Sequence, residues 1–491
     1  MKLSALFDNA PDIEIENLMV DSRDVLPNAI FFCIKGMIHD GHRYVNAAIK
    51  NGAVCIVHSE DIKRNNTNVI YIKVRDVTAA LNQVATCFYG YPSKKMVVYG
   101  VTGTNGKSSI ACMIRNLLNP IYACGYIGTI SIEYGDTKLP PLLTTPDIVP
   151  LQKTLHDMAE AQMKACALEI SSIGLEQHRT DSVDVDIAIF TNLTHDHLDY
   201  HGTMENYFEA KKRLFDQLKP EGTAITNKDD PHGMAVVADC PAHVVTYGVL
   251  EKADYEAKDI QLNADKTAFT LVYEGQEYPV QTNLVAMFNL YNLLAVIAAL
   301  HEGGLPLEQI LDQLNTIPQI EGRMERIEEG QPFNIIVDFA HTPDGLEQIF
   351  KFASAITPKE KRIISVFGSA GKRDTKKRPV FGQLADKYCD LIILTEDDPR
   401  DEDPIQIAEE IASGIEKTNR IIIESRYDAI RQAIEVANVG DTILILGKGD
   451  ETFIYREFGR EPWMSDPAAA RDALHKYYFE TEEEEEDETV E

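Results

Sequence analysis

The chain has 491 residues, a formal net charge of −31 at pH 7 and eight cysteines. A chain of this length is too long for one hydrophobic core and suits about three domains of ordinary size. Its acidity argues against nucleic acid as a partner, because phosphate backbones are bound through clustered lysine and arginine. No segment approaches the roughly 18 uncharged apolar residues of a membrane span, so we expect a cytoplasmic protein.

An acidic segment ends the chain, and the cysteines are scattered through it. Segment 480–491 holds nine acidic residues and no basic one, so removing it leaves a net charge of −22. Such a run is normally a solvated, disordered end. The cysteines form no Cys-x-x-Cys pair, which argues against a zinc site or a disulfide framework and favours core residues in a reducing compartment. We expect a monomer, although the sequence itself specifies no oligomeric state.

Residues 1–92 mix short strands and helices and are expected to form the first domain. The runs Asp21-Ser22-Arg23 and His39-Asp40-Gly41-His42 place short polar side chains next to turns. Such side chains suit a ligand's sugar or phosphate, but they equally suit helix caps and turns, and the residues alone leave both readings open. Strands are expected at 29–34, 54–58 and 69–74, and helices at 44–51 and 77–89.

A glycine-rich loop is the most informative stretch of the chain. It runs Gly103-Thr-Asn-Gly106-Lys107-Ser108, after an apolar strand and before a helix expected at 110–118. The glycines allow backbone N–H groups to turn toward an anion, the lysine adds a charge, and the serine offers a hydroxyl to Mg²⁺. Val101 stands where the strict Walker pattern has glycine, so the loop is a shortened variant. A chance glycine-rich turn is the alternative, which the flanking strand and helix disfavour.

Segment 95–323 alternates strands and helices, which favours a mostly parallel sheet with its ligand at the carboxyl ends of the strands. Buried-strand runs at 165–170 and 183–190 end in the polar segments 169–172 and 191–202. We therefore expect both polar segments beside the glycine-rich loop.

The second polar segment holds three histidines and two aspartates. It lacks the thiolates and the helical histidine spacing of a zinc site, so Mg²⁺ held by oxygens with at most one imidazole is favoured, and histidines that cap the next helix are the structural alternative. That helix, expected at 204–218, carries Lys211. From the residue type alone, Lys211 is expected to lie at the surface in contact with solvent. Asn289 and Asn292 precede another apolar helix, expected at 293–301; they share a helix face and suit either an adenine edge or a helix cap.

Beyond Glu321-Gly322-Arg323-Met324 the pattern restarts as a second doubly wound α/β unit. Four of its expected strands end in polar loops, at 338–341, 368–374, 397–400 and 447–451. Four such loops at one edge of a sheet describe a binding site. The strands are expected at 334–338, 362–367, 391–394, 420–423 and 442–446, and the helices at 343–354, 379–387, 405–415 and 428–437.

The predicted fold is α/β with three domains: residues 1–92, a central domain 93–323 with the phosphate loop in a mostly parallel sheet, and a Rossmann-like doubly wound domain 324–491 that ends in the acidic tail. Over residues 21–451 the chain resembles the Mur ligases, and within them the MurE type. The motifs that carry the resemblance are Gly100-Val-Thr-Gly-Thr-Asn-Gly-Lys107-Ser108, Thr144-Thr-Pro-Asp147, Glu169-Ile-Ser-Ser172, Asp196-His-Leu-Asp-Tyr-His-Gly202, Gly322-Arg-Met-Glu325, Asp338-Phe-Ala-His-Thr-Pro-Asp344 and Gly447-Lys-Gly.

The resemblance implies an enzyme that couples ATP hydrolysis to peptide-bond formation during peptidoglycan synthesis. It would add the third residue, a diamino acid, to UDP-N-acetylmuramoyl-L-alanyl-D-glutamate. An acyl phosphate on the D-glutamate γ-carboxylate would be the intermediate, because a carboxylate is a poor electrophile until it carries a good leaving group. The implied partners are small molecules: ATP, Mg²⁺, the UDP-muramoyl dipeptide and the diamino acid.

Site residues follow from the resemblance position by position. The ATP phosphates would lie on Gly103, Thr104, Asn105, Gly106, Lys107 and Ser108, with Asn292, Arg323, Asp338 and His341 as further ATP contacts. The catalytic and metal-side residues would be Lys107, Ser108, Glu169, His197 and Lys211, the last as a carbamylated lysine rather than solvated surface. Ser22 would contact the uridine in the N-terminal domain, and the muramoyl dipeptide would be held by Thr144, Thr145, Ser171, Gln177 and Arg179. The incoming amino acid would be read by Arg373, Asp398, Arg400, Gly447 and Glu451.

The chain departs from the family pattern where the amino acid is read. Asp398 stands in a loop that is Asp-Asn-Pro-Arg in the meso-diaminopimelate pattern, and Asp450 stands where histidine is usual. These two carboxylates suit the terminal ammonium of L-lysine, whereas Arg373 and Arg400 suit the distal carboxylate of meso-diaminopimelate. We favour meso-diaminopimelate, because a buried arginine without its carboxylate would be costly. Two smaller departures are Ser108 for the usual threonine and Ala286 for a usual glycine.

Three other readings compete with this one. A folylpolyglutamate or UDP-N-acetylmuramate–alanine ligase shares the fold, but the Asp21-Ser22-Arg23 segment and the Asp-Pro-Arg loop favour the MurE type. An inactive paralogue that only binds or regulates would be expected to lack Lys107, His197 or Lys211, and all three are present. A generic P-loop switch or motor would not need the second α/β unit with its four polar loops.

Overall fold

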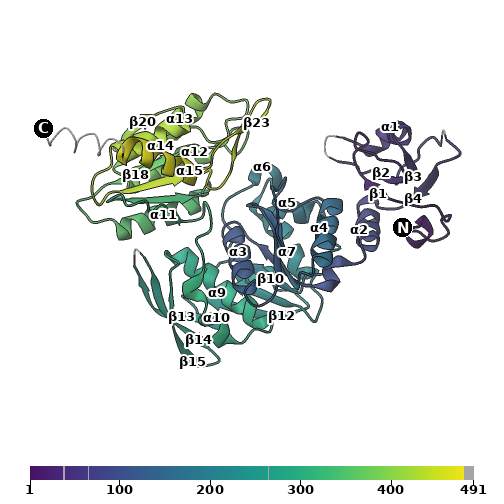
Figure 1. Cartoon of the computed structure of the whole chain (residues 1–491), viewed down its shortest axis with the longest axis horizontal. Coiled ribbons are helices and arrows are strands. Elements are labelled where there is room, and N and C mark those ends of the chain that lie inside the picture. The colour runs from purple at the N-terminus through teal and green to yellow at the C-terminus, as the bar shows by residue number, and fades with distance from the viewer. Residues whose placement is uncertain (37–38, 65, 264, 480–491) are drawn as a thin grey trace.

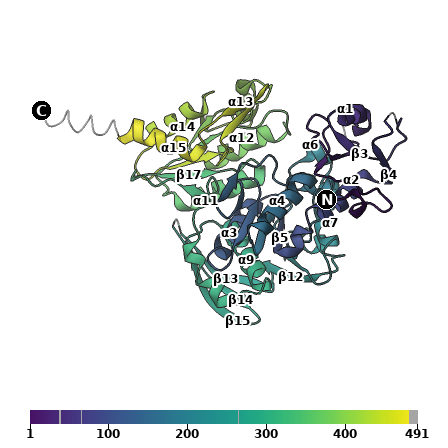
Figure 2. The same ribbon diagram turned by 45° about the vertical axis from the view of Figure 1, so that its right-hand side comes forward.

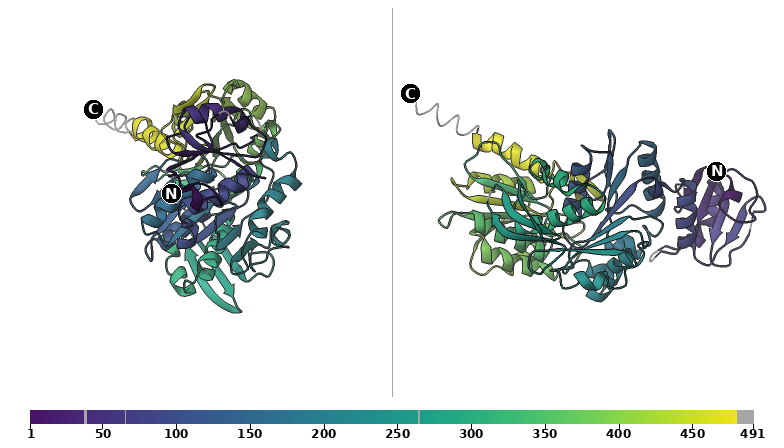
Figure 3. Two further views of the ribbon diagram at one scale, coloured as in Figure 1. Left: turned by 90° about the vertical axis from the view of Figure 1, so that its right-hand side faces the viewer. Right: turned by 90° about the horizontal axis from the view of Figure 1, so that it is seen from below.

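The computed structural model describes residues 1–36, 39–64, 66–263 and 265–479, so the acidic segment 480–491 lies outside the described residues. Three β-sheets build three units, and the central unit lies between the N-terminal unit, purple in Figure 1, and the C-terminal unit, green to yellow (Figures 1 and 3). The sheets fall within the three expected domains, whose boundaries stay a prediction. None of the helices that the structure describes is both long and apolar enough to cross a membrane.

The N-terminal unit is a four-stranded parallel sheet. Its last helix begins after Asp76, whose carboxylate accepts hydrogen bonds from the backbone N–H groups of Thr78 (2.8 Å) and Ala79 (3.0 Å), as an N-cap does. This helix packs against α4 (Ile148–Glu160) of the central unit. In chain order the elements are β1 (Asn17–Met19), β2 (Ala29–Phe32), α1 (Val45–Lys50), β3 (Ala53–His58), β4 (Ile70–Lys73) and α2 (Val77–Phe88).

The central unit is built on an eleven-stranded sheet with β5 (Val97–Thr102) in its interior. β9 (Ala165–Glu169) and β10 (Ile187–Phe190) flank β5 in parallel, so their carboxyl ends meet at the glycine-rich loop, as expected. Helices lie against this part of the sheet (Figure 2), and apolar side chains pack on both of its faces. The other parallel strands are β6 (Cys124–Ile127), β11 (Thr223–Asn227) and β12 (His243–Gly248), and the helices are α3 (Lys107–Leu118), α4, α5 (Ser172–Glu176), α6 (Leu198–His201), α7 (Met204–Asp216), α8 (Gly233–Val236), α9 (Met287–Glu302) and α10 (Leu307–Leu311).

Strands that were not predicted extend both edges of this sheet, and they pair antiparallel except for one short parallel pairing with β12. These strands are short or alternate buried with exposed residues, unlike the continuous apolar runs of the parallel core. They are β7 (Ile132–Tyr134) and β8 (Thr137–Leu139) at one edge, and β13 (Tyr255–Leu262), β14 (Thr267–Tyr273) and β15 (Gln276–Thr282) at the other.

The C-terminal unit is the expected doubly wound fold, with a six-stranded sheet whose two faces are both covered. Its strands run parallel except for the first, and four of the polar loops follow neighbouring strands. The sheet order is β16 (Glu325–Arg326), β17 (Asn334–Asp338), β21 (Thr442–Leu446), β18 (Ile363–Phe367), β19 (Leu391–Leu394) and β20 (Asn419–Ile422). A separate hairpin, β22 (Phe453–Arg456) and β23 (Gly459–Pro462), precedes the last helix, and the helices are α11 (Pro343–Ile356), α12 (Lys377–Tyr388), α13 (Pro404–Ala412), α14 (Arg426–Glu435) and α15 (Asp466–Leu474).

Several expected elements have different bounds, and two of these differences have a clear physical reason. The strand expected at 183–190 begins only at Ile187, because the preceding Asp184 and Asp186 each pair with Lys219 at 2.9 Å instead of entering the apolar core. Helix α9 begins at Met287, ahead of the expected start, so its two asparagines lie inside the helix and do not cap it. Ala286, which precedes α9, has a φ of 74°, a conformation that favours glycine.

Candidate active site

The glycine-rich loop joins β5 to α3, and its two glycines have positive φ, 148° at Gly103 and 90° at Gly106. A Cβ atom at Gly103 would lie 1.7 Å from the Thr191 hydroxyl oxygen, and one at Gly106 would lie 2.5 Å from the Asn292 amide oxygen. Both positions therefore exclude a side chain. The first N–H groups of α3 have no intrahelical partner and are the groups that bind an anion at a helix N-terminus.

Two lysines, the half-buried Lys107 and the buried Lys211, meet at the carbonyl group of Gly103. Lys107 Nζ donates to the carbonyl oxygens of Gly103 (3.0 Å) and Thr104 (2.8 Å), and Lys211 Nζ donates to that of Gly103 (2.8 Å). Burial lowers the pKa of both lysines, and the charge of Lys107 lowers the pKa of Lys211 further. Lys211 is only 1% exposed, so its reading as solvated surface was wrong.

Glu169, at the carboxyl end of β9, is fully buried and accepts four hydrogen bonds. The donors are Ser108 Oγ (2.9 Å), Tyr126 Oη (2.6 Å), Thr129 N (3.0 Å) and Thr129 Oγ1 (3.1 Å). Thr129 Oγ1 also lies 3.0 Å from Thr144 Oγ1. A carboxylate and a hydroxyl thus lie side by side at the phosphate loop, and oxygen ligands of this kind are those that Mg²⁺ prefers.

The three histidines of the segment after β10 diverge. His195 Nδ1 lies 3.8 Å from Asp374 Oδ2 of the C-terminal unit, His201 contacts α5, and His197 Nε2 lies 3.3 Å from Asp196 Oδ2. They therefore do not gather around one ion. Burial lowers the pKa of His197 to about 4, so the imidazole is neutral and able to act as a single metal ligand beside the oxygen donors.

The C-terminal unit closes directly onto the phosphate loop. Asn105 Nδ2 donates to Asp344 Oδ2 (3.1 Å), and His341 Nε2 lies 3.9 Å from Asp196 Oδ2. Burial alone would raise the pKa of the Asp196 carboxyl, but His197, His341, Lys377 and the backbone N–H of His197 favour the carboxylate and lower the pKa to about 2. Asp196 therefore lies between His197 of the central unit and His341 and Lys377 of the C-terminal unit.

Arg323 and Asp338 lie at the entry to the C-terminal unit. The Arg323 guanidinium carbon lies 4.1 Å from the ring centre of Phe339, and Nη2 lies 3.9 Å from Asp450 Oδ1. Asp338 Oδ2 accepts a hydrogen bond from the backbone N–H of Met324 (2.7 Å), and burial raises the pKa of both Asp338 and Asp450. The buried Nε of Arg323 has no partner, which leaves a donor for an anionic ligand.

A cavity of ≈ 170 Å³ lies between α3, α9 and the segment that leads to Arg323. Asn289 lines it, whereas Asn292 touches the phosphate loop and donates to Asn289 Oδ1 (3.2 Å). Amide and apolar side chains around a cavity of this kind suit a planar base. The lining includes Met113, Leu284, Val285, Asn289, Ile320 and Arg323.

Four residues predicted to hold the muramoyl dipeptide form one hydrogen-bonded group behind Glu169. Thr145 Oγ1 donates to the Glu169 carbonyl oxygen (2.9 Å) and accepts from the backbone N–H of Ser171 (2.9 Å). Arg179 Nη1 donates to the carbonyl oxygen of Thr145 (2.8 Å), and Nη2 donates to Gln177 Oε1 (2.6 Å). The group therefore joins the ends of β9 and α5 into one surface beside the phosphate loop.

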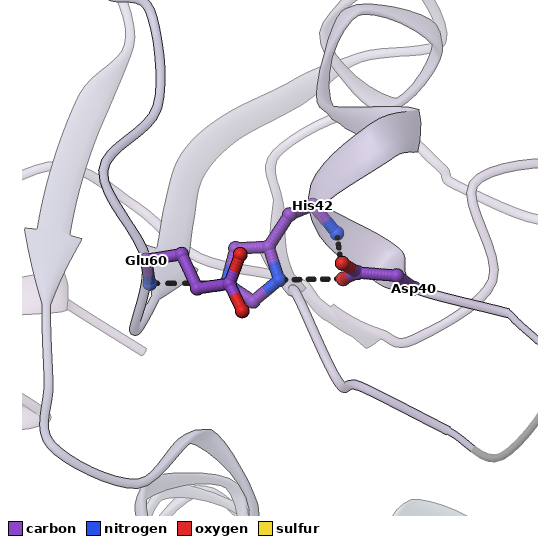
Figure 4. A group of neighbouring side chains, drawn as sticks. All are labelled: Asp40, His42 and Glu60. Carbon is purple, nitrogen blue, oxygen red and sulfur yellow. Dashed lines mark hydrogen bonds and ion pairs between the residues drawn. The ribbon is translucent and has the colours of Figure 1, made fainter.

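The N-terminal unit carries the buried Ser22 and, among the described residues, the one group of side chains whose spacing suits a metal: Asp40, His42 and Glu60 (Figure 4). His42 Nδ1 lies 2.7 Å from Asp40 Oδ1, and His42 Nε2 accepts from the backbone N–H groups of Ser59 (3.2 Å) and Glu60 (3.3 Å). Both ring nitrogens are in use, so this group fits a structural brace rather than a metal site.

In the C-terminal unit a fully buried lysine holds two of the residues predicted to read the amino acid. Lys448 Nζ donates to Asp398 Oδ1 (2.8 Å) and pairs with the Glu451 carboxylate. Burial lowers the pKa of a lysine, but Asp397, Glu451 and Asp398 outweigh this and raise that of Lys448. Burial raises the pKa of Glu451 to about 7.

The two arginines predicted for the amino acid lie in different surroundings. The Arg400 N–H donates to the Tyr455 carbonyl oxygen (2.9 Å), and its guanidinium pairs with no carboxylate in the described parts of the chain. Arg373 Nη1 instead lies 3.3 Å from Asp199 Oδ2 of the central unit. Gly447 follows β21 at the same edge of the sheet. Arg400 is therefore the arginine left for a ligand.

Sequence reasoning missed several of these side chains. Tyr126 and Thr129, which complete the bonding of Glu169, carry no local signal, because a hydroxyl in or after an apolar strand is common. Lys377, which donates to the His341 carbonyl oxygen (2.9 Å), begins a helix that was expected only from Pro379. Lys448 was named only as part of its motif.

Three family models match successive parts of the chain. They describe the Mur ligase family catalytic domain (residues 14–89), the Mur ligase middle domain (residues 101–300) and the Mur ligase glutamate ligase domain (residues 322–449). The matches cover the phosphate loop and the polar loops of the C-terminal unit.

Curated relatives and solved structures agree with these matches. The UDP-N-acetylmuramoyl-L-alanyl-D-glutamate--2,6-diaminopimelate ligase 1 of Clostridium acetobutylicum is 38% identical over 90% of this chain and 91% of its own length, and the ligase of Alkaliphilus metalliredigens with the same substrates in its name is 40% identical over 89% of each. A solved UDP-N-acetylmuramoyl-L-alanyl-D-glutamate--2,6-diaminopimelate ligase superposes with a TM-score of 0.69 at 30% identity, covering 97% of this chain and 99% of that one. The MurF ligase of Thermotoga maritima in complex with ADP shares the fold, with a TM-score of 0.64 at 18% identity over 94% of this chain and 97% of its own. The chain therefore belongs to the Mur ligase family.

Proposed function

We propose that this chain is an ATP-dependent ligase of peptidoglycan synthesis. It joins the amine of meso-diaminopimelate to the D-glutamate γ-carboxylate of UDP-N-acetylmuramoyl-L-alanyl-D-glutamate. Relatives named for these substrates align over 90% of the chain. The observation that carries the proposal is the meeting of Lys107, Lys211 and the Ser108–Glu169 pair at the phosphate loop, under a C-terminal unit already in contact with it.

ATP would lie across the junction of the central and C-terminal units. The phosphates would replace the Gly103 and Thr104 carbonyl oxygens as partners of Lys107, and the base would enter the cavity beside Asn289. Arg323 fits the phosphates, because its buried Nε has no hydrogen-bond partner among the described residues and the carboxylate of Asp450 is 3.9 Å away. The further residues that we propose for ATP are Gly103, Asn105, Gly106, Ser108, Asn292, Asp338 and His341.

Ser108, Glu169 and His197, with a carbamylated Lys211, would hold Mg²⁺, which when bound neutralises charge on the transferred phosphoryl group. The surroundings of Lys211 suit the modification, because burial favours its neutral amine, the form that adds CO₂. The resulting carbamate would turn a second ammonium at Gly103 into an anionic ligand.

The reaction then has two steps. An oxygen of the D-glutamate γ-carboxylate attacks the γ-phosphorus of ATP, the bond to ADP breaks, and an acyl phosphate forms. The neutral amine of the diamino acid attacks the acyl carbon, and phosphate leaves. Lys107 holds the phosphoryl oxygens, Arg179 and its bonded group hold the dipeptide, and His341 closes the site from the C-terminal unit. Thr144, Thr145, Ser171 and Gln177 complete the dipeptide site, and Ser22 contacts the uridine.

The charge pattern of the C-terminal unit favours meso-diaminopimelate over L-lysine. The carboxylate of Asp398, which would suit a terminal ammonium if it stood alone, is already neutralised by Lys448. Asp450 faces Arg323 rather than the amino-acid loop. The Arg400 guanidinium has no carboxylate partner among the described residues, which leaves it for the distal carboxylate of diaminopimelate. Arg373, Gly447 and Glu451 would form the rest of this site.

A ligation assay with purified protein, UDP-muramoyl dipeptide and Mg-ATP tests the proposal. It compares meso-diaminopimelate with L-lysine as the amino acid that is added. We expect product and ADP to form together, with a kcat/KM at least tenfold higher for meso-diaminopimelate. A preference for lysine would overturn the assigned substrate, and absence of ligation with either amino acid would favour the inactive-paralogue reading. We place the reaction in the cytoplasm and expect a monomer, since one chain supplies every residue named for the site.

A further inference from the structure

The β22–β23 hairpin is tied to the loop that is predicted to read the amino acid. The backbone N–H of Tyr455 donates to Asp398 Oδ1 (3.0 Å), and its carbonyl oxygen accepts from the backbone N–H of Arg400 (2.9 Å). Arg400 itself has a φ of 57°, an uncommon conformation for a residue other than glycine. The hairpin therefore fixes the position of this loop from one side.

Two guanidinium groups lie on the side chain of Tyr455. Arg460 Nε and Nη2 donate to Tyr455 Oη at 3.1 and 2.7 Å, and the Arg460 guanidinium carbon lies 5.1 Å from the ring centre. The guanidinium carbon of Arg400 lies 5.8 Å from the same ring centre. One tyrosine thus contacts both an arginine of the hairpin and an arginine of the loop.

Neither guanidinium pairs with a carboxylate within the described residues, although acidic side chains abound in this chain of net charge −31. Arg456, in the same hairpin, pairs with both Glu396 and Glu461. Both arginines contact Tyr455, and neither has a carboxylate partner among the described residues. Their N–H groups can therefore donate hydrogen bonds to an anionic ligand. Arginine matches the geometry of a carboxylate better than that of other common anionic groups except phosphate.

We propose that Arg460 is a specificity-determining residue, which together with Arg400 binds the distal carboxylate of the acceptor amino acid. Tyr455 is a positioning residue that holds both guanidinium groups. The inference rests on the proposed function, because it needs an acceptor with a second carboxylate. L-lysine would present an ammonium to two cations, so the same pair of arginines attracts diaminopimelate and repels lysine.

Steady-state ligation by Arg460→Gln tests the inference, with kcat and KM measured for meso-diaminopimelate and for L-lysine at saturating ATP and dipeptide. We expect KM for meso-diaminopimelate to rise about tenfold, the effect of one charged hydrogen bond, with kcat within about twofold. KM for L-lysine should stay unchanged or fall. Tyr455→Phe, which keeps the ring and removes the hydroxyl acceptor, should raise KM for meso-diaminopimelate by about threefold, and Arg460→Lys should recover part of the loss.

Arg420→Gln is the matched control, because Arg420 is an exposed arginine of β20 in the same unit and donates only to the Ile415 carbonyl oxygen (3.4 Å). It should change neither KM. The role of Arg460 is overturned if Arg460→Gln raises KM equally for both amino acids, or does not raise it for meso-diaminopimelate. If Arg460→Gln fails to fold, the same two outcomes measured in Tyr455→Phe overturn it. A wild-type protein that prefers lysine overturns the proposed substrate before any variant is measured.

Discussion

The two halves of the candidate site treat buried lysines in opposite ways. At the phosphate loop, Lys107 and Lys211 donate hydrogen bonds to main-chain carbonyl oxygens, and burial lowers the pKa of both. In the C-terminal unit, Lys448 is fully buried but is enclosed by Asp398 and Glu451, and its pKa is raised although burial opposes this.

The difference follows from what each half would bind. An uncompensated ammonium is costly to bury, so it is expected where an anionic ligand arrives to pair with it. ATP and an acyl phosphate bring such charge to the central unit. An amino acid with ammonium and carboxylate groups brings both signs, so a compensated site recognises it by the arrangement of charges rather than by their sum.

Among the changes that test this comparison, Lys211→Ala should have the largest effect, which is a loss of ligase activity. The variant removes the group that would become the carbamate, and we expect kcat for ligation to fall about a thousandfold, as when an electrostatic group at a reacting centre is lost. Coupled measurement of ADP release and of ligated product checks this, and added bicarbonate should not restore activity.

Lys212→Ala is the control for this variant, because Lys212 lies next to Lys211 on α7 but pairs with Asp216 (2.6 Å) and Asp239 (2.8 Å). It should keep ordinary activity. Ordinary activity in Lys211→Ala would remove Lys211 from the catalytic site.

Much of the phosphate-loop half could be predicted from the sequence. Parallel buried strands read as apolar runs, and their carboxyl ends must meet at one edge, which placed Glu169 and the histidine-rich segment beside the loop. The buried position of Lys211 was also readable, because it follows Tyr207 by four residues and precedes Leu214 by three, in the buried stripe of α7. Only the resemblance to a family drew attention to it.

The acceptor half was less predictable, because its charges are compensated across long stretches of chain. Asp398 and Lys448 are 50 residues apart, and no local pattern indicates that their side chains pair. The β22–β23 hairpin was missed because it is short and its second strand is exposed throughout, which leaves no apolar alternation to detect. Asp398 therefore appeared in the sequence as a free negative charge.

Lys448→Met should have the second-largest effect, which is a loss of stability of the folded protein. The substitution leaves Asp398 and Glu451 without their shared cation, and loss of one partner of a buried pair costs about 3 kcal/mol or more. For a unit of this size about 1 kcal/mol shifts the melting temperature by roughly 2–4 °C, so we expect a fall of at least about 6 °C in thermal denaturation.

Adding Asp398→Asn and Glu451→Gln to Lys448→Met should recover part of that fall, since the triple variant leaves no unpaired charge. A single variant that melts at the wild-type temperature would show that Lys448 and its two carboxylates do not compensate each other. The corresponding change at the phosphate loop, Lys107→Met, should raise rather than lower the melting temperature, because it removes an ammonium that forms no ion pair among the described residues and whose pKa burial lowers.

The smallest effect is the pH dependence that Glu451 contributes. Burial raises its pKa in the folded protein to about 7, above the usual value of 4.5, so its contribution to stability is fully present below about pH 4.5 and is lost as pH rises through 7. Relative to Glu451→Gln, the wild type should therefore lose about 2–3 kcal/mol between pH 5 and pH 8, or roughly 5–10 °C in melting temperature. Glu457→Gln is the control, because Glu457 is an exposed glutamate directly after β22. Its melting temperature should follow that of the wild type at every pH. If the melting temperatures of Glu451→Gln and the wild type changed in parallel with pH, the prediction would be wrong. Lys448 would then keep Glu451 ionised over the whole pH range.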